Sequence, residues 1–102
     1  MRRFAAVVCC LMAGPLVTPA EAGDFFKGRQ LYAQHCSRCH GNDGKPVLPG
    51  TPNLSRGEGL LAPDQVLLRS LRFGKGSMPG FEALLRGKEL YDVLIYVRSL
   101  HR

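Results

Sequence analysis

The sequence has no tryptophan, no strand-like alternation of apolar and polar positions, and no internal repeat in its 102 residues. Without such alternation there is no signal for half-buried β-strands, which disfavours sheet folds and the βαβ setting of thioredoxin-like proteins. No apolar run reaches the about 20 residues that a membrane-spanning helix needs. The length leaves room for one domain.

The first 22 residues have the pattern of a secretory signal peptide. Two arginines follow the initiating methionine, residues 4–17 are mostly apolar, and residues 20–22 read Ala-Glu-Ala. This order predicts cleavage after Ala22 and export to the periplasm; the alternative is an uncleaved membrane anchor. The predicted organisation is a signal peptide over residues 1–22 and a single domain over residues 23–102.

The predicted mature chain is small and basic. Its 80 residues keep 12 basic and 7 acidic side chains, for a formal charge of +5. A chain this short rarely builds a sufficient hydrophobic core alone, so a bound apolar group would help to stabilise it.

Residues 36–40, Cys-Ser-Arg-Cys-His, are the most informative motif in the chain. Two cysteines three positions apart and followed at once by histidine form the attachment pattern of a c-type haem. Cys36 and Cys39 can each form a thioether with one haem vinyl group, and His40 would bind the iron from one side. We therefore expect one covalently attached haem c.

Three other interpretations of this motif stay open. A zinc site needs further ligands, but Cys9 and Cys10 lie in the predicted signal peptide. A thioredoxin-like redox pair should occur in a βαβ context, which is missing here. A disulfide between Cys36 and Cys39 would close a very short loop.

Met78 is the expected second iron ligand. It is the only methionine outside the predicted signal peptide, and Pro79 and Gly80 place it on a loop. Methionine is more often a core filler than a ligand. Paired with His40, however, a thioether gives the ligation typical of electron-carrying cytochromes c. We predict His40 and Met78 as the metal ligands and no catalytic residue.

The rest of the chain predicts helices joined by loops. We expect helices from Phe25 to the motif, from near Pro63 to a stop at Gly74, and from about Lys88 to Leu100. The expected buried face of the last helix comprises Leu90, Val93, Leu94, Val97 and Leu100.

Several single positions support these helices. Asp24 can cap the first helix, and Gly28 within it suggests that another helix crosses close by. In the last helix, Glu89 and Asp92 fall in the first turns and Arg98 in the last, which suits the helix dipole. No Ser, Thr or Asp stands where that helix should be capped.

Three prolines at positions 46, 49 and 52 predict an extended loop after the motif. Such a loop would cover the His40 side of the haem. One of its backbone carbonyls could accept a hydrogen bond from His40 Nδ1 and fix the tautomer of the ring. Leu54 would pack on the haem.

Over residues 24–100 the chain resembles class I c-type cytochromes. Gly28 and Tyr32 match the glycine and the aromatic residue that the family places eight and four positions before the first haem cysteine. Val93 and Tyr96 match the pair that the family's last helix packs against that glycine. The resemblance implies an all-α fold, with three to four helices wrapped around one haem.

Two further segments carry the resemblance. Residues 51–54, Thr-Pro-Asn-Leu, match the family's Gly-Pro-Asn-Leu segment, which implies that Pro52 is the carbonyl partner of His40 and that Leu54 belongs to the haem site. The loop around Met78 and the short length are similar to small cytochromes c encoded beside haem-d-type nitrite reductases. The tryptophan that often meets a haem propionate is missing, so the resemblance does not identify the propionate partners.

The function implied is that of a periplasmic electron carrier. Such a protein passes single electrons between a donor and an acceptor, here with a haem-d-type nitrite reductase in denitrification as the implied acceptor. With both axial positions of the iron occupied, we expect no enzyme activity. Basic side chains near the ligands, among them Arg38, Lys45 and Lys75, could steer the protein to an acidic partner surface.

Two alternative functions stay open. The chain could be an accessory haem protein in the maturation of a partner reductase, or a haem sensor with a labile sixth ligand. In each case we expect a monomer without nucleic-acid partners and without stable membrane insertion once the signal peptide is removed.

Overall fold

The computed structural model describes residues 5, 14 and 23–102, so the predicted signal peptide lies almost wholly outside the described residues. The elements are the helices α1 (Phe25–His35), α2 (Ser37–His40), α3 (Asp64–Phe73) and α4 (Gly87–Ser99), with a 3₁₀ turn, η1 (Leu54–Arg56). The described part contains no β-strand, only an isolated bridge between Lys75 and Met78. The prediction of an all-α fold is confirmed.

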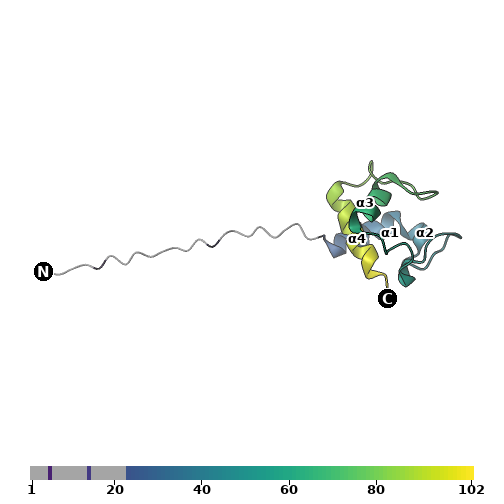
Figure 1. The fold of residues 1–102 in the computed structure, drawn as a ribbon, viewed down its shortest axis with the longest axis horizontal. Helices are drawn as coiled ribbons and strands as arrows, with labels where there is room; N and C mark the ends of the chain where they lie inside the picture. Colours follow the sequence, from purple (N-terminus) through teal and green to yellow (C-terminus); the bar gives the residue numbers. More distant parts are fainter. Residues whose placement is uncertain (1–4, 6–13, 15–22) are drawn as a thin grey trace.

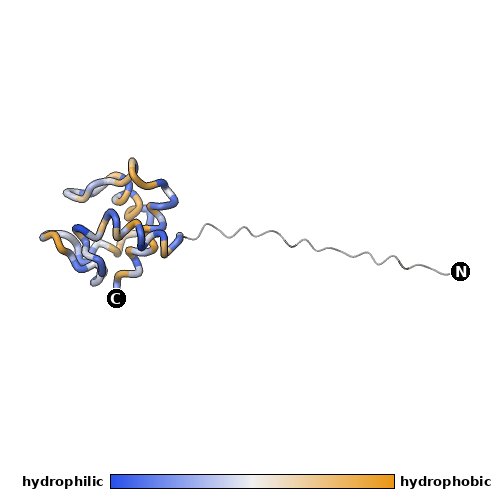
Figure 2. Tube along the Cα trace, turned by 180° about the vertical axis from the view of Figure 1, so that it is seen from behind, coloured by the Kyte–Doolittle hydropathy of each residue, from blue (hydrophilic) through white to orange (hydrophobic). Residues whose placement is uncertain are grey.

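The helices pack around α4. Helix α1 crosses it, α3 lies beside it, and α2 continues from the end of α1 toward the outer loops (Figure 1). Figure 2 shows that hydrophobic segments occur on the outer loops as well as in the helices. Within the described residues, no helix is long and apolar enough to span a membrane.

Helix α1 begins and ends as its sequence predicts. The Asp24 side chain accepts a hydrogen bond from the Lys27 N–H at 3.0 Å, which caps the helix. At the other end, the Cys36 N–H donates to the carbonyl of Tyr32. The motif continues directly as α2, which ends at Gly41 with a φ of 77°. Because glycine tolerates this left-handed φ, the chain can turn sharply after His40.

The crossing of α1 and α4 is a backbone-to-backbone contact at Gly28. A Cβ atom there would lie 2.0 Å from the carbonyl oxygen of Asp92 and 3.1 Å from Tyr96 Cβ. Glycine within a helix costs about 1 kcal/mol relative to alanine, but here no larger residue fits. The expectation that another helix crosses at Gly28 is confirmed.

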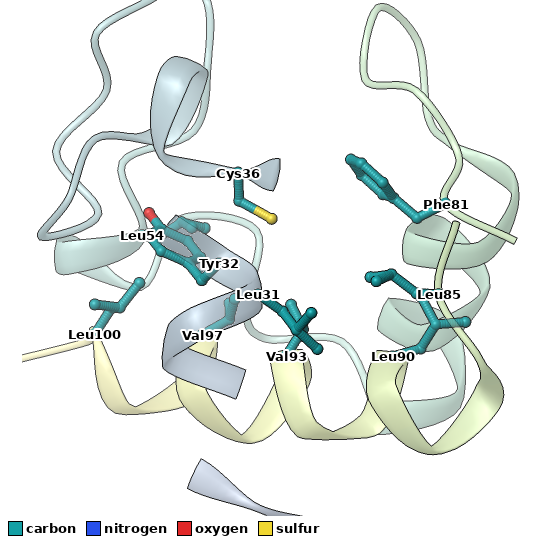
Figure 3. Close-up of a cluster of buried hydrophobic side chains, with 10 residues drawn as sticks. All are labelled: Leu31, Tyr32, Cys36, Leu54, Phe81, Leu85, Leu90, Val93, Val97 and Leu100. Carbon is teal, nitrogen blue, oxygen red and sulfur yellow. The ribbon is translucent and has the colours of Figure 1, made fainter. Parts of the chain in front are cut away.

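Helix α4 supplies most of the core. All five residues expected on its buried face are buried. The cluster shown in Figure 3 consists of Leu31, Tyr32, Cys36, Leu54, Phe81, Leu85, Leu90, Val93, Val97 and Leu100. The helix starts at Gly87, one residue before the expected position, and the Arg86 N–H donates to Glu89 Oε1 at 3.0 Å. Glu89 therefore stabilises the start of a helix that lacks a Ser, Thr or Asp cap.

The last turn of α4 holds the loop that precedes α3. The Arg98 guanidinium donates to the carbonyl oxygens of Leu60 and Ala62 at 3.0 and 2.9 Å, and to Asp64 Oδ1 at 2.7 Å. Arg98 was expected only to complement the helix dipole. Its three bonds instead fix the backbone around Leu60, which lines the cleft described next.

Candidate functional site

A cleft of about 700 Å³ of empty space, part of it open to solvent, contains the predicted site residues. Among its lining residues are Cys36, His40, Pro52, Leu54 and Met78. These positions are separated by up to 42 residues in the sequence, and the fold brings them to one cavity. Cys39 is half-buried and is not among the lining residues.

The first wall of the cleft is the motif itself. Cys36 stands where α1 passes into α2 and is 8% exposed. Burial, and secondarily the neighbouring Cys39, raises the pKa of the Cys36 thiol to about 11. Figure 3 shows the Cys36 sulfur directed toward the side where Phe81 lies.

The alternative interpretations of the motif find no support in the described residues. Cys36 and Cys39 are both free thiols, so they form no disulfide with each other. Within the described part of the chain, no three His, Cys, Asp or Glu side chains gather as a zinc site requires. The surroundings of the motif are helix and loop, without the β-strands of a thioredoxin-like site.

His40 has the properties of a metal ligand. Burial lowers its pKa, and the backbone of Pro52 partly opposes this shift. The neutral ring is therefore favoured at neutral pH, and neutral imidazole is the form that binds metals. His40 Nδ1 is buried without a fully formed hydrogen bond, although the Pro52 backbone lies beside the ring. The Pro52 backbone is therefore near the ring, as a carbonyl partner would have to be, but no hydrogen bond to Nδ1 is formed.

The backbone that follows His40 is held by Tyr32. The Tyr32 hydroxyl donates to the Gly41 carbonyl oxygen at 2.6 Å, and the whole side chain is 1% exposed. Burial is also the main reason why the pKa of Tyr32 is raised. From the sequence, Tyr32 was expected only as the aromatic residue that the family places before the motif. The missed signal is that a buried tyrosine hydroxyl usually finds a hydrogen-bond partner.

Met78 lies on a tight loop that folds back onto the end of α3. The backbones of Lys75 and Met78 exchange hydrogen bonds of 3.1 and 3.0 Å. The Phe81 N–H then donates to the Leu71 carbonyl at 2.9 Å. A Cβ atom at Gly80 would lie 2.6 Å from the Arg72 carbonyl oxygen, so the return of the loop requires glycine. The half-buried Met78 is held on the cleft by this geometry.

The remaining walls are mainly aliphatic. They are formed by Leu60, Leu67, Leu71, Leu94 and Val97. Of these, Leu94 and Val97 were expected on the buried face of the last helix, and none was assigned to a cofactor. His101, another nitrogen donor in this chain, does not line the cleft; its ring atoms lie about 3 Å from where a Cβ atom on Gly57 would stand.

This donor set fits a haem. Imidazole nitrogen and thioether sulfur are suitable axial ligands for haem iron, and the two thiols have the spacing for covalent attachment. The aliphatic walls suit a large apolar ring. The one buried polar atom of the site without a hydrogen bond, His40 Nδ1, belongs to the residue that would bind the iron.

Comparison with known proteins agrees with this geometry. Residues 23–97 match the protein-family model described as "Cytochrome C oxidase, cbb3-type, subunit III". The chain is 34% identical over 92 residues to the cbb3-type cytochrome c oxidase subunit CcoP of Rhodobacter capsulatus, covering 80% of this chain and 31% of that protein. It is 30% identical over 95 residues to cytochrome c6 of Rippkaea orientalis, covering 89% of this chain and 84% of that protein.

A solved structure shares the fold. The KustC0563 c-type cytochrome superposes with a TM-score of 0.68 at 27% identity, covering 74% of this chain and 98% of that one.

The oxidase subunits and the cytochromes c6 differ in how much of their own length this chain covers. The chain spans about a third of the length of the cbb3-type oxidase subunits that it matches, but most of the length of cytochrome c6.

Proposed function

We propose that this chain, which belongs to the c-type cytochrome family described as "Cytochrome C oxidase, cbb3-type, subunit III", carries single electrons between redox proteins of the periplasm. The chain is a small class I c-type cytochrome, and this family implies a covalently attached haem c. The observation that carries the proposal is that Cys36, His40 and Met78 line one largely aliphatic cleft.

In this proposal each site residue has one task. Cys36 and Cys39 would attach a single haem through thioether bonds, and His40 and Met78 would bind its iron. When bound, the haem supplies a one-electron Fe(II)/Fe(III) couple. The Pro52 carbonyl orients the His40 ring, and Leu54 packs against the haem and helps to keep water from the site.

A carrier is favoured over an enzyme or a sensor because both axial positions would be filled. Three features restrain the Met78 side: the paired backbone of Lys75 and Met78, the close approach of Gly80 to α3, and the bond from Phe81 to Leu71. A restrained thioether favours a permanent ligand over a labile one. The chain would then hold the same ligands in both oxidation states, which keeps the reorganisation on electron transfer small.

The site of action in this proposal is the periplasm. Residues 1–22 act as a signal peptide that is removed after Ala22, and residues 23–102 form the mature single domain. Basic side chains steer it to an acidic partner surface. Lys75 lines the cleft, and Arg38 and Lys45 are exposed on or just after α2.

The identity of the electron acceptor is the most specific part of the proposal. The loop around Met78 and the short length favour a haem-d-type nitrite reductase, whereas the CcoP and FixP relatives are named as oxidase subunits. Stopped-flow mixing of the reduced protein with each purified enzyme, the nitrite reductase or the oxidase, distinguishes these two candidate acceptors. If neither enzyme oxidises the reduced protein quickly, and a strain that lacks this protein fails to assemble the reductase, a role in maturation would be favoured.

A redox titration of exported protein, followed by visible spectroscopy and combined with intact-mass analysis, tests the core of the proposal. We expect one one-electron transition, the spectrum of a c-type haem with His/Met ligation, and the mass of residues 23–102 plus one haem. A bare-chain mass, or a reduced protein that binds carbon monoxide at once, would contradict it.

A further inference from the structure

Asp92 is a buried carboxylate at the crossing of α1 and α4. Its side chain is 1% exposed. Oδ1 accepts a hydrogen bond from the Asp24 N–H at 2.7 Å, whereas the buried Oδ2 has no hydrogen-bond partner among residues 23–102. The Lys88 ammonium lies 3.7 Å from Oδ2, on a side chain that is 55% exposed. A buried charge needs close partners, and one distant, solvated lysine is a weak one.

The backbone just before Asp24 lies against the same helix. A Cβ atom on Gly23 would be 2.4 Å from Ile95 Cγ1 and 3.1 Å from Tyr91 Cδ1. Gly23 therefore packs on the α4 turn that includes Asp92. Its nitrogen belongs to the peptide unit next to the Asp24 N–H, which already binds the carboxylate.

We propose that Asp92 is the binding site for the α-ammonium group that signal-peptide cleavage creates on Gly23. Cleavage adds water across the Ala22–Gly23 amide bond, so that Ala22 gains a carboxylate and Gly23 gains a protonated amine. Before cleavage this nitrogen is an uncharged amide. Afterwards it carries a positive charge and three donors, which can satisfy Oδ2.

The chemistry of the site favours this occupant. The carboxylate lies at the N-terminal end of α1, where the unpaired N–H groups and the helix dipole already favour negative charge. A terminal ammonium on a short, packed glycine loses little side-chain entropy, unlike Lys88, which must hold a long flexible chain in place. The ion pair would fasten the start of α1 to α4, beside the Gly28 contact, only in the processed protein.

This inference rests on the processing proposed above. The test uses haem-loaded protein that is exported with a specific protease site directly before the mature chain. Cleavage at this site sets which residue comes first. Four proteins are compared: chains that begin at Gly23 or with one alanine added before Gly23, each with Asp92 or with Asp92→Asn. The added alanine keeps a terminal charge but moves it by one residue, about 3.8 Å.

The measured quantity is the folding equilibrium constant from urea unfolding. We expect the added alanine to lower it about tenfold when Asp92 is present and to leave it unchanged in the Asp92→Asn background. Lys88→Met serves as the control and should leave the tenfold difference in place. Equal effects of the added alanine in both backgrounds, or loss of the difference in Lys88→Met, would overturn the ion pair.

A second measurement does not depend on unfolding. Acylation of the α-amine by an activated ester near neutral pH, followed by mass spectrometry, should be about tenfold slower with Asp92 than with Asp92→Asn, because a buried, protonated amine is a poor nucleophile. Equal rates would overturn the proposal. A native first residue other than Gly23 would refute the processing itself, whereas a native Gly23 without coupling refutes only the ion pair.

Discussion

The hydroxyl of Tyr32 donates a 2.6 Å hydrogen bond to the carbonyl of Gly41, the residue directly after His40. This bond joins the middle of α1 to the end of α2 and so spans the whole motif. Gly41 is itself buried, and its positive φ begins the loop that returns to Pro52. The position of the His40 backbone therefore depends on a side chain one helix away.

Removing this hydroxyl should destabilise the protein at the site without creating a cavity in the core. In Tyr32→Phe the ring stays in place, but the Gly41 carbonyl oxygen keeps only the longer, 3.4 Å hydrogen bond from the Gly44 N–H. We expect the free energy of unfolding to fall by about 1–2 kcal/mol, measured by urea unfolding of the haem-loaded protein. Tyr96→Phe is the matched control, because the Tyr96 ring packs edge-on against Tyr32 at 5.2 Å and its hydroxyl makes no hydrogen bond to any residue of the described part. Equal losses in both variants would show that the bond to Gly41 contributes nothing specific.

Gly28→Ala should destabilise the protein although alanine is the better helix former. Its Cβ atom would meet the Asp92 carbonyl oxygen at 2.0 Å, so α1 and α4 must move apart. We expect a loss of about 1–3 kcal/mol in the free energy of unfolding. Gly87→Ala, at the start of α4, is the control, since its Cβ atom would meet only the Arg72 guanidinium at 3.7 Å. That variant should be neutral or slightly more stable, and a neutral Gly28→Ala would contradict the observed crossing.

Local sequence signals predicted much of this fold. The Asp24 cap, the stop of α3 at Gly74 and the buried face of α4 each depend on neighbours within a few residues, and all three are confirmed. Gly28 was informative for a different reason. A glycine in a helix interior is unfavourable, and a close helix crossing is one of the few ways to offset that cost.

The roles that local sequence signals did not reveal depend on contacts between distant elements. Asp92 was expected to serve the helix dipole, but the crossing at Gly28 buries it and gives it the Asp24 N–H as a partner. Arg98 was also expected to complement the helix dipole, and in addition it donates a hydrogen bond to the Leu60 carbonyl and so holds that loop. Neither role leaves a periodic or local pattern, because the partners are 34 or more residues away in the sequence.

Met78→Ala tests the proposed sixth ligand. The change leaves the attachment motif intact, so haem should still be incorporated. Loss of the thioether should lower the reduction potential, because this ligand favours ferrous iron, and should remove the weak sulfur-to-iron band of the ferric protein. Leu84→Ala is the control, at an exposed side chain a few residues further along. An unchanged potential and an intact band in Met78→Ala would assign the sixth ligand to another residue, although His101 lies at Gly57 and does not line the cleft.

Charge reversal at Lys75 tests how the protein meets its partners. Lys75 lines the cleft and lies on the loop that carries Met78, so its charge stands beside the proposed haem site. In Lys75→Glu we expect the second-order rate of electron transfer to an acidic partner to fall several-fold at low salt, while the reduction potential changes little. The difference from the unaltered protein should shrink as salt approaches physiological strength, because exposed charges are screened. Lys27→Glu makes the same change of net charge at the start of α1, away from the cleft, and should have a smaller effect. If both variants slow transfer equally, overall charge guides the encounter; if neither does and salt has no effect, docking depends on apolar contacts instead.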